Sequence, residues 1–512
     1  MAARSLPNAD KQHMLLQAAG IASNAAAIAL IVGQSPAKVV GWLEMGRGIL
    51  AGNVQDLRTD LAMLQERHSD LAASFDNSRG ILDGTIKNES ILPRMSHGSS
   101  IRLETEKRRQ AHHQLETTVQ AIRKQPEFER FLLPPAEDEI LAAANSPIVI
   151  INVSCHRCDA LIVLPSGFEC IKLSSNLYHD IQEHRMNLTS PSKAMLEWLW
   201  DYIVSPVLTR LEILAPTPSG QQWPRIWWIP TGPLVGFPLH AAGYHQEEQG
   251  RTTLDRVVSS YAISIRSIRG AMHTREQPHQ ETPAGSRIAL VTMTDTPELS
   301  PLHFASLETR SVQAVCQSMG LKLMVPVPCK REVLSVLQSS QIFHFAGHGG
   351  THDDPLKSLL LLKDWKTDPL TSDSILQTNL SFKAPFLAYL SACRTGQVRN
   401  KDSVDESIHL TAAYQLAGFR HVIGTLWSVD DSICVEMARM IYEVLRDDGI
   451  NDKAVREGLH RASRRLRDVW VQNDKVKIEA FTGRRSERDG KLDDDTARER
   501  PALWVPYVHY GA

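Results

Sequence analysis

Two short stretches of the chain combine the residue types needed for nucleophilic chemistry. "IFHFAGHGG" (Ile342–Gly350) is an apolar run that ends in glycines around His348, and "FLAYLSACRTG" (Phe386–Gly396) is a second apolar run that leads to Cys393. The thiolate is the reactive form of cysteine, so an efficient thiol nucleophile needs a base or a lowered pKa. An imidazole nearby supplies both. The pattern therefore predicts a pair in which Cys393 attacks and His348 exchanges protons.

The spacing of these stretches fits two neighbouring strands of one sheet. In a parallel sheet, functional groups gather beyond the carboxyl ends of the strands. The chain between His348 and Cys393 is long enough for one crossover, so the two strand ends are expected to face each other. A tetrahedral intermediate also needs donors for its oxyanion, and the backbone N–H groups of Gly349 and Cys393 are candidates.

The surrounding sequence alternates between apolar strands and amphipathic helices from Ser286 onward. Such alternation predicts a parallel sheet that is covered on both faces. The expected strands are "RIALVTM", "IFHFAG", "PFLAYLSA" and "HVIGTLW", and the expected helices span Leu307–Met319, Arg331–Gln338, Ser407–Ala417, Ser432–Leu445 and Asp452–Leu466. A mixed-charge insertion is expected over Lys477–Glu499, followed by a closing strand in "ALWVPYVHYG".

Three regions differ in character along the chain. Residues 1–145 repeat apolar residues at helical spacing, residues 146–280 begin with short β-branched runs, and residues 281–512 carry the alternating pattern. The amphipathic run Val39–Leu57 is expected to be helical. Cys155 and Cys158 resemble half of a zinc site, but they are expected on a strand, where residues three apart point to opposite faces, so no metal is predicted.

Composition argues against several classes of protein. The 512 residues include 56 Lys and Arg against 58 Asp and Glu, and a net charge of −2 provides no field to attract nucleic acid or an anionic membrane. The apolar segment Ile21–Gly33 is too short for a membrane span. Seven cysteines without a framework spacing indicate reduced thiols, which favours a cytoplasmic protein.

Four blocks of the sequence resemble one known family. "HFAGHG", "YLSACRTG", "AGFRHVIGTLWSVDD" and "LWVPYVHYG", within about Trp198–Gly511, are similar to the CHAT domain, a caspase-like family of cysteine peptidases often found behind tetratricopeptide (TPR) repeats. The stretch Gly41–Leu61 resembles the helical region that precedes this domain in fungal members. The resemblance implies an α/β fold, a caspase-like sheet covered by helices. Residues 146–280 would form a degenerate half without catalytic residues, residues 281–512 the catalytic half, and residues 1–145 a helical, TPR-like region.

The resemblance also assigns roles to individual residues. By motif position, His348 is the general base or imidazolium partner, Cys393 is the nucleophile and Gly349 provides an oxyanion donor. In this family an acidic turn follows the histidine, matched here by "DDPLKSLLLL". Asp353 or Asp354 would then bind a basic side chain before the scissile bond, since a carboxylate pairs well with Arg or Lys.

Together these observations predict a cysteine endopeptidase that hydrolyses protein substrates through a Cys-His dyad, without a metal or organic cofactor. A regulatory protein would bind the N-terminal helices. The main alternative is a catalytically silent scaffold in a signalling assembly. A serine hydrolase is disfavoured, because no Gly-x-Ser-x-Gly turn occurs in the chain.

Overall fold

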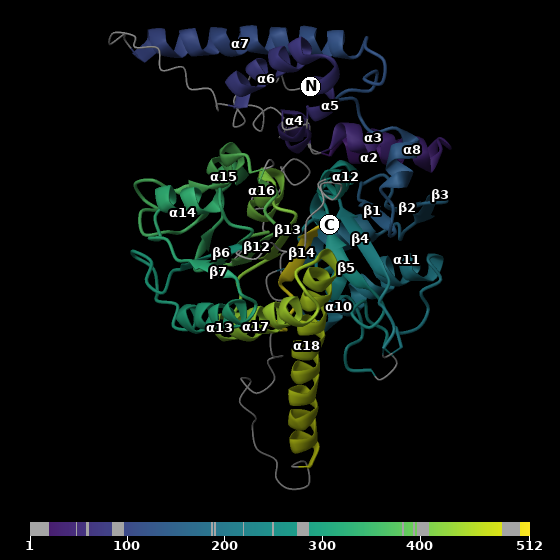
Figure 1. Ribbon diagram of the computed structural model, residues 1–512. Coiled ribbons are helices and arrows are strands. Elements are labelled where there is room, and N and C mark those ends of the chain that lie inside the picture. Colours follow the sequence, from purple (N-terminus) through teal and green to yellow (C-terminus); the bar gives the residue numbers. More distant parts are fainter. Residues whose placement is uncertain are drawn as a thin grey trace.

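The computed structural model places a long mixed sheet at the centre of the molecule and helices around it (Figure 1). The structure describes residues 20–47, 49–57, 61–83, 97–185, 188, 191–218, 220–247, 250–273, 286–380, 383–392, 395–396, 409–483 and 502–512. None of the helices in these ranges has the length and apolarity needed to cross a bilayer.

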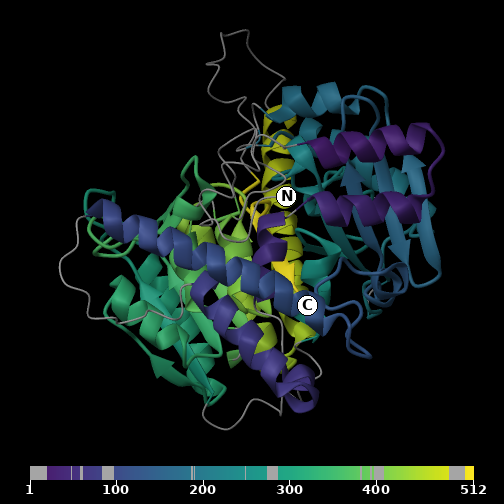
Figure 2. The ribbon, with the colours of Figure 1, turned by 90° about the horizontal axis from the view of Figure 1, so that it is seen from above.

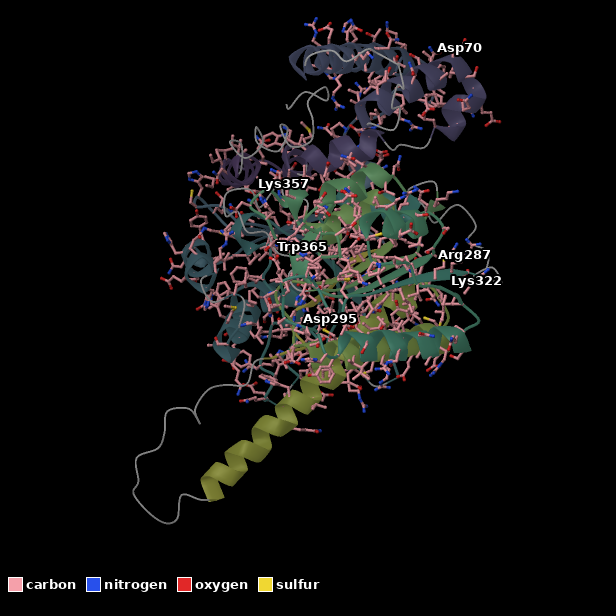
Figure 3. The ribbon with its side chains drawn as sticks, turned by 90° about the vertical axis from the view of Figure 1, so that its left-hand side faces the viewer. Asp70, Arg287, Asp295, Lys322, Lys357 and Trp365 are labelled. Carbon is pink, nitrogen blue, oxygen red and sulfur yellow. The ribbon has the colours of Figure 1, made fainter. Side chains whose placement is uncertain are left out.

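Eleven strands form the central sheet, in the order β3-β2-β1-β4-β5-β14-β13-β12-β8-β6-β7. Their bounds are β1 Ile148–Asn152, β2 Asp159–Leu164, β3 Gly167–Lys172, β4 Arg225–Pro230, β5 Val258–Tyr261, β6 Arg287–Thr292, β7 Lys322–Met324, β8 Ile342–Ala346, β12 Leu387–Ser391, β13 His421–Thr425 and β14 Tyr507–Gly511. Figure 3 shows Arg287 and Lys322, the paired first residues of β6 and β7, at one edge of this sheet.

The expected parallel sheet is present over β7, β6, β8, β12 and β13. Every residue of β8, β12 and β13 is buried, which explains why these strands read as continuous apolar runs. The closing strand β14 is antiparallel to β13. The fold class expected from the sequence, an α/β sheet covered by helices behind an N-terminal helical region, is confirmed.

Helices cover both faces of the β6–β13 part of the sheet (Figure 1). Phe343 and Phe345 pack with α14 (Lys330–Leu337), α15 (Ser372–Thr378) and α16 (Leu410–Ala417). Ile342 and Tyr389 pack with α13 (Ala305–Ser318), α17 (Asp431–Asp447) and α18 (Asp452–Gly483). Because side chains alternate along a strand, one residue of β8 serves one face and the next serves the other.

The C-terminal strand joins the two parts of the sheet. β14 pairs with β13 along its length and also with β5, through Tyr510 and Tyr261. Around β1–β5 lie α8 (Glu137–Ala142), α9 (Leu177–His184), α10 (Lys193–Leu199), α11 (Ser205–Arg210) and α12 (Ile265–His273). One sheet therefore runs through residues 146–280 and 281–512, and their division into a degenerate and a catalytic half remains a prediction.

Five of the described N-terminal helices fall into two groups. Helices α2 (Ile21–Ile31) and α3 (Pro36–Gly46) lie side by side over the β1–β4 part of the sheet (Figure 2), where Val39 and Val40 pack with strand residues. α5 (Ala62–Arg67), α6 (Ser69–Asp83) and α7 (His97–Ile122) share a separate core around Phe75 and Leu115. The region is helical as expected, and its TPR-like character stays a prediction.

The structure refines one local expectation from the sequence and contradicts two others. The run Val39–Leu57 is two helices, α3 and α4 (Ile49–Leu57), with extended backbone at Arg47 between them. Cys155 and Cys158 lie in the loop between β1 and β2, not on a strand. Helix α18 continues to Gly483, past the start of the expected insertion, because residues 467–482 contain no proline or glycine to stop it. Residues 484–501 of that insertion lie outside the described residues.

A chain of buried polar groups crosses the sheet where β14 joins its neighbours. Asp452 Oδ1 lies 3.0 Å from Nε2 of His421, whose Nδ1 lies 3.0 Å from Nε2 of His509. His509 Nδ1 is 2.9 Å from the Ser260 hydroxyl on β5. Burial lowers the pKa of His421 to about 4, although the Asp452 carboxylate opposes this shift. The imidazole is therefore neutral in the folded protein at pH 7.

This buried imidazole predicts a loss of stability in mild acid. Between pH 6.5 and about pH 4 the unfolded chain protonates His421 while the folded chain does not, so the free energy of unfolding falls as the pH is lowered. For this one group the fall from pH 7.5 to pH 5 amounts to about 2 kcal/mol. Urea unfolding at both pH values measures it. His421→Gln should shrink the difference between the two pH values, and the same change at the exposed His179 should not. An unaltered difference in His421→Gln would contradict the assignment.

Candidate functional site

The ends of β8 and β12 lie side by side at the centre of the candidate site. The two strands pair in parallel, with Ala346 opposite Ser391, and the N–H of Gly347 donates to the Ser391 carbonyl at 3.1 Å. His348 follows Ala346 by two residues, as Cys393 follows Ser391. The strands are thus the neighbours that the spacing predicted. Cys393 itself lies outside the described residues, so the approach of thiol and imidazole stays a prediction.

Gly347 occupies a point where no side chain fits. A Cβ there would lie 2.7 Å from the Phe345 ring and 2.8 Å from Cβ of Met293. Met293 is close because its N–H donates to the Ala346 carbonyl at 2.8 Å, which extends the β6–β8 pairing. The glycine before His348 therefore lets three strand ends converge.

The imidazole of His348 is half-buried and held at one nitrogen. Nε2 lies 2.9 Å from the backbone carbonyl of Ser300. Since a carbonyl oxygen can only accept, Nε2 carries the proton in this contact, and the neutral ring keeps an acceptor at Nδ1. The geometry assigns this tautomer and leaves Nδ1 able to take a proton from another group.

The loop that contains Ser300 is anchored at several points. Leu302 N–H donates to Thr294 O at 2.9 Å, and Phe304 N–H donates to the carboxylate of Asp431 at 2.8 Å. The indole N–H of Trp365 donates to the carbonyl of Pro297 at 3.3 Å, and both Trp365 and Asp295, a residue of the Ser300 loop, are labelled in Figure 3. These contacts fix the carbonyl that orients the imidazole.

The backbone of Gly349 lies at the edge of a small second sheet. This sheet has the order β11-β10-β9, with β9 Gly349–Gly350, β10 Leu359–Leu360 and β11 Leu370–Thr371. Leu361 N–H donates to His348 O at 3.0 Å, so Gly349 and Leu360 form the next, non-hydrogen-bonded pair of the antiparallel ladder. The N–H of Gly349 consequently points away from β10 and off the edge of the sheet.

The two acidic candidates after the histidine differ in their surroundings. Asp353 is exposed. Asp354 caps the short 3-10 helix Pro355–Lys357, because its Oδ1 accepts the N–H of Leu356 at 3.1 Å, and Oδ2 lies 3.7 Å from Lys357 Nζ. The cap gives Asp354 a structural purpose, and a substrate role for either residue stays a prediction.

Sequence reasoning missed three residues around the strand ends. Ser300 contacts His348 through its backbone carbonyl, and the residue type at a position does not predict a backbone contact. Glu308 is only 2% exposed and accepts a hydrogen bond from the Ser391 hydroxyl at 2.9 Å. An acid at an apolar position of the helix α13 was the available signal for Glu308, whereas Ser391 looked like any small residue of a buried strand.

Two other thiols of the chain, Cys170 and Cys316, are poorly suited to attack. Burial raises the pKa of Cys170 to about 11, helped by the Asp159 carboxylate, and raises that of Cys316 to about 12. Both remain protonated at pH 7 and are weak nucleophiles. Cys155 and Cys158 are free, and the described residues contain no group of three or more His, Cys, Asp or Glu able to hold a metal ion.

Comparison with known proteins identifies one family. The family model of the CHAT domain matches residues 193–512, close to the range of the four blocks. A search of curated protein sequences gave no match. Among solved structures, a Saccharomyces cerevisiae separase–securin complex is 10% identical with a TM-score of 0.43, and the alignment covers 93% of this chain and 37% of that one.

A second group of structures comes from bacterial proteinases. The complex of Porphyromonas gingivalis RgpB pro- and mature domains is 12% identical with a TM-score of 0.36, covering 60% of this chain and 70% of that one. The structure of gingipain R, described as an Arg-specific cysteine proteinase, is 10% identical with a TM-score of 0.35 and coverages of 60% and 66%. The chain thus spans little more than a third of the separase chain just named and about two thirds of the gingipain chains. These TM-scores are all below 0.5, so function is argued from the family match over residues 193–512.

The steric role of Gly347 can be tested directly. Gly347→Ala should destabilise the protein by about 1–3 kcal/mol, because the new methyl group overpacks the contact with Phe345 and Met293. Urea unfolding measures the change. Gly41→Ala is the matched control, since helix α3 leaves open space there and alanine should stabilise by about 0.5–1 kcal/mol. Equal stability of Gly347→Ala and the parent protein would contradict the close approach.

Proposed function

The chain belongs to the CHAT domain family, and from that premise we propose that it is a cysteine endopeptidase with Cys393 as nucleophile and His348 as its proton acceptor. The observation that carries the proposal is the pairing of β8 with β12. It brings the ends of the two motif-bearing strands together while Ser300 fixes the imidazole tautomer.

The first half of the proposed reaction forms an acyl-enzyme. His348 Nδ1 takes the proton of the Cys393 thiol, and the thiolate attacks the carbonyl carbon of the scissile peptide bond. The N–H of Gly349, directed off its sheet edge, and the N–H of Cys393 would donate to the developing oxyanion. The intermediate collapses, the C–N bond breaks, and the amine leaves with the proton from Nδ1. A thioester remains on the sulfur.

The second half returns the enzyme to its starting state. Nδ1 accepts a proton from water as the water attacks the thioester, and the same oxyanion donors act again. Breaking the C–S bond releases the acid product, and the sulfur recovers its proton from the imidazolium. The reaction requires no metal or organic cofactor. It does require a reduced thiol, which is consistent with a cytoplasmic location.

Partners follow from this reaction and from the arrangement of the helices. The substrate would be a protein with an accessible extended segment. The group α5–α7 has a core separate from that of the sheet, and it offers a place for a regulatory protein to bind. A silent scaffold is the second candidate function, favoured by the same separate helical core. The two functions differ in whether Cys393 reacts.

Covalent labelling separates the enzyme from the scaffold. We expect an acyloxymethyl ketone peptide to label the protein, labelling to vanish in Cys393→Ala, and its rate to fall about 100-fold or more in His348→Ala, as expected for loss of proton transfer. Intact-protein mass spectrometry measures the labelled fraction over time.

His352→Ala is the matched control, because this histidine of the same loop is exposed and its Nδ1 accepts the Asp354 N–H at 2.9 Å in the following turn. It should label at the parent rate. Labelling that is indifferent to both Cys393→Ala and His348→Ala would support the scaffold.

The acidic turn gives a prediction about specificity. If Asp353 binds a basic side chain, Asp353→Asn should lower kcat/KM about tenfold or more for peptides with Arg before the scissile bond, since a charged hydrogen bond is lost. Peptides with citrulline, the neutral analogue of arginine, should be unaffected. Asp354→Asn should leave the ratio of the two peptides unchanged, because its carboxylate serves the cap. An unchanged ratio in Asp353→Asn would rule out this role.

A further inference from the structure

One buried carboxylate connects the two strands beneath the candidate site. Glu308 lies in the first turn of α13 and faces the sheet, with 2% of its surface exposed. Burying a carboxylate is costly unless hydrogen bonds or an opposite charge compensate. A glutamate retained at this position therefore needs partners, and the structure shows two.

The two oxygens of Glu308 contact different strands. Oε2 accepts the hydroxyl of Ser391 on β12 at 2.9 Å, and Oε1 lies 3.2 Å from Nε2 of His344 on β8. His344 is fully buried, stacks on Tyr389 with ring centroids 4.8 Å apart, and has Nδ1 3.2 Å from the hydroxyl of Tyr442. One side chain thus contacts both neighbouring strands, the last residue of β12 and the middle residue of β8.

Ser391 is the point at which these contacts meet the candidate site. Its hydroxyl binds Glu308, and its carbonyl accepts the N–H of Gly347, the residue before His348. Two residues further along the chain is Cys393. A shift of Ser391 would therefore move the end of β12 and the start of the His348 loop together.

The loop that leads into helix α13 also contacts the imidazole. The loop that precedes it contains Ser300, whose carbonyl orients His348 at 2.9 Å. The helix begins at Ala305 and presents Glu308 in its first turn. The same segment therefore contacts His348 through a backbone carbonyl and the end of β12 through a carboxylate.

We propose that Glu308, acting through Ser391, is a positioning residue that sets the relative placement of the two strand ends carrying the dyad. This role rests on the proposed function. The role is geometric. The Glu308 carboxylate holds the Ser391 hydroxyl, the Ser391 carbonyl holds the Gly347 N–H, and the Ser300 carbonyl before α13 holds the ring of His348. Loss of the bridge should leave the sheet intact and disturb the dyad, since a misplacement of about 1 Å can cost on the order of 100-fold in rate.

The test follows the reactivity of Cys393 itself. Iodoacetamide alkylates the full-length protein, and peptide-resolved mass spectrometry gives the rate constant at Cys393 from pH 5 to pH 9. Ser391→Ala removes one hydroxyl, and Glu308→Gln removes the charge at nearly constant shape. For both variants we expect alkylation at pH 7 to slow roughly 10- to 100-fold. The pH of half-maximal rate should rise toward the value of a free thiol, about 8.5.

The control distinguishes positioning from mere stabilisation. Thr309→Val removes a buried hydroxyl from the next residue of α13, where it donates to the carbonyls of Ala305 at 3.1 Å and Ser306 at 3.4 Å, both within the helix. Urea unfolding measures the stability of all variants. Thr309→Val should keep the parent pH profile even where its loss of stability equals that of Ser391→Ala. A profile that shifts equally in all three variants would overturn the positioning role.

His348→Ala separates failure of this inference from failure of the proposed function. If His348→Ala slows Cys393 alkylation while Ser391→Ala and Glu308→Gln keep the parent rate and pH profile, the Cys393–His348 dyad is supported and the positioning role is overturned. If His348→Ala leaves the rate and the pH profile unchanged, the dyad itself is refuted, and the positioning role with it.

Discussion

The candidate site depends on the register between β8 and β12. Ala346 opposes Ser391, and the Gly347 N–H closes the pairing on the Ser391 carbonyl. A slip of one residue would turn every side chain of β8 to the opposite face. Phe343 would then meet the buried carboxylate of Glu308, and His344 would enter the apolar core beside α14. One face of β8 requires apolar side chains and the other requires a polar partner for Glu308, so the register is fixed. The register in turn fixes where the residues after each strand begin.

The strands of this region were predictable because they are buried on both faces. Burial on both sides requires continuous apolar runs, and glycine-containing turns mark where β8 and β12 end. The adjacency of the two strands followed from the room for one crossover between them. The bridge through Glu308 could not be foreseen in the same way, because a single acid on a helix usually faces solvent. Ser300 acts through an atom that every residue has, so its partnership with His348 appears only in three dimensions.

Two helices differ in extent from what the sequence pattern indicates. Helical periodicity runs through Val39–Leu57, but the sequence pattern does not reveal that α3 packs on the sheet while α4 packs against α16. The change of packing partner requires a break near Arg47. The stretch Lys477–Glu499 was expected to be an insertion because it is rich in charges of both signs and has few apolar residues. Helix α18 nevertheless continues there, since the backbone bonds of a helix need good helix formers and no breaker, and do not need an apolar face along their full length.

The pairing of Glu308 with His344 also suits the electrostatics of a thiolate. An isolated buried carboxylate near the end of β12 would disfavour a negative sulfur by like-charge repulsion. The imidazole of His344 lies 3.2 Å from one carboxylate oxygen, and the Ser391 hydroxyl donates a hydrogen bond to the other. Because both groups face the carboxylate, it is not an isolated charge, and its hydrogen bond to Ser391 holds the end of β12 in place. Replacing it with apolar side chains could match its stability. Such side chains would lack the directional contact that ties the hydroxyl of Ser391 to α13, and with it the link between the two strand ends.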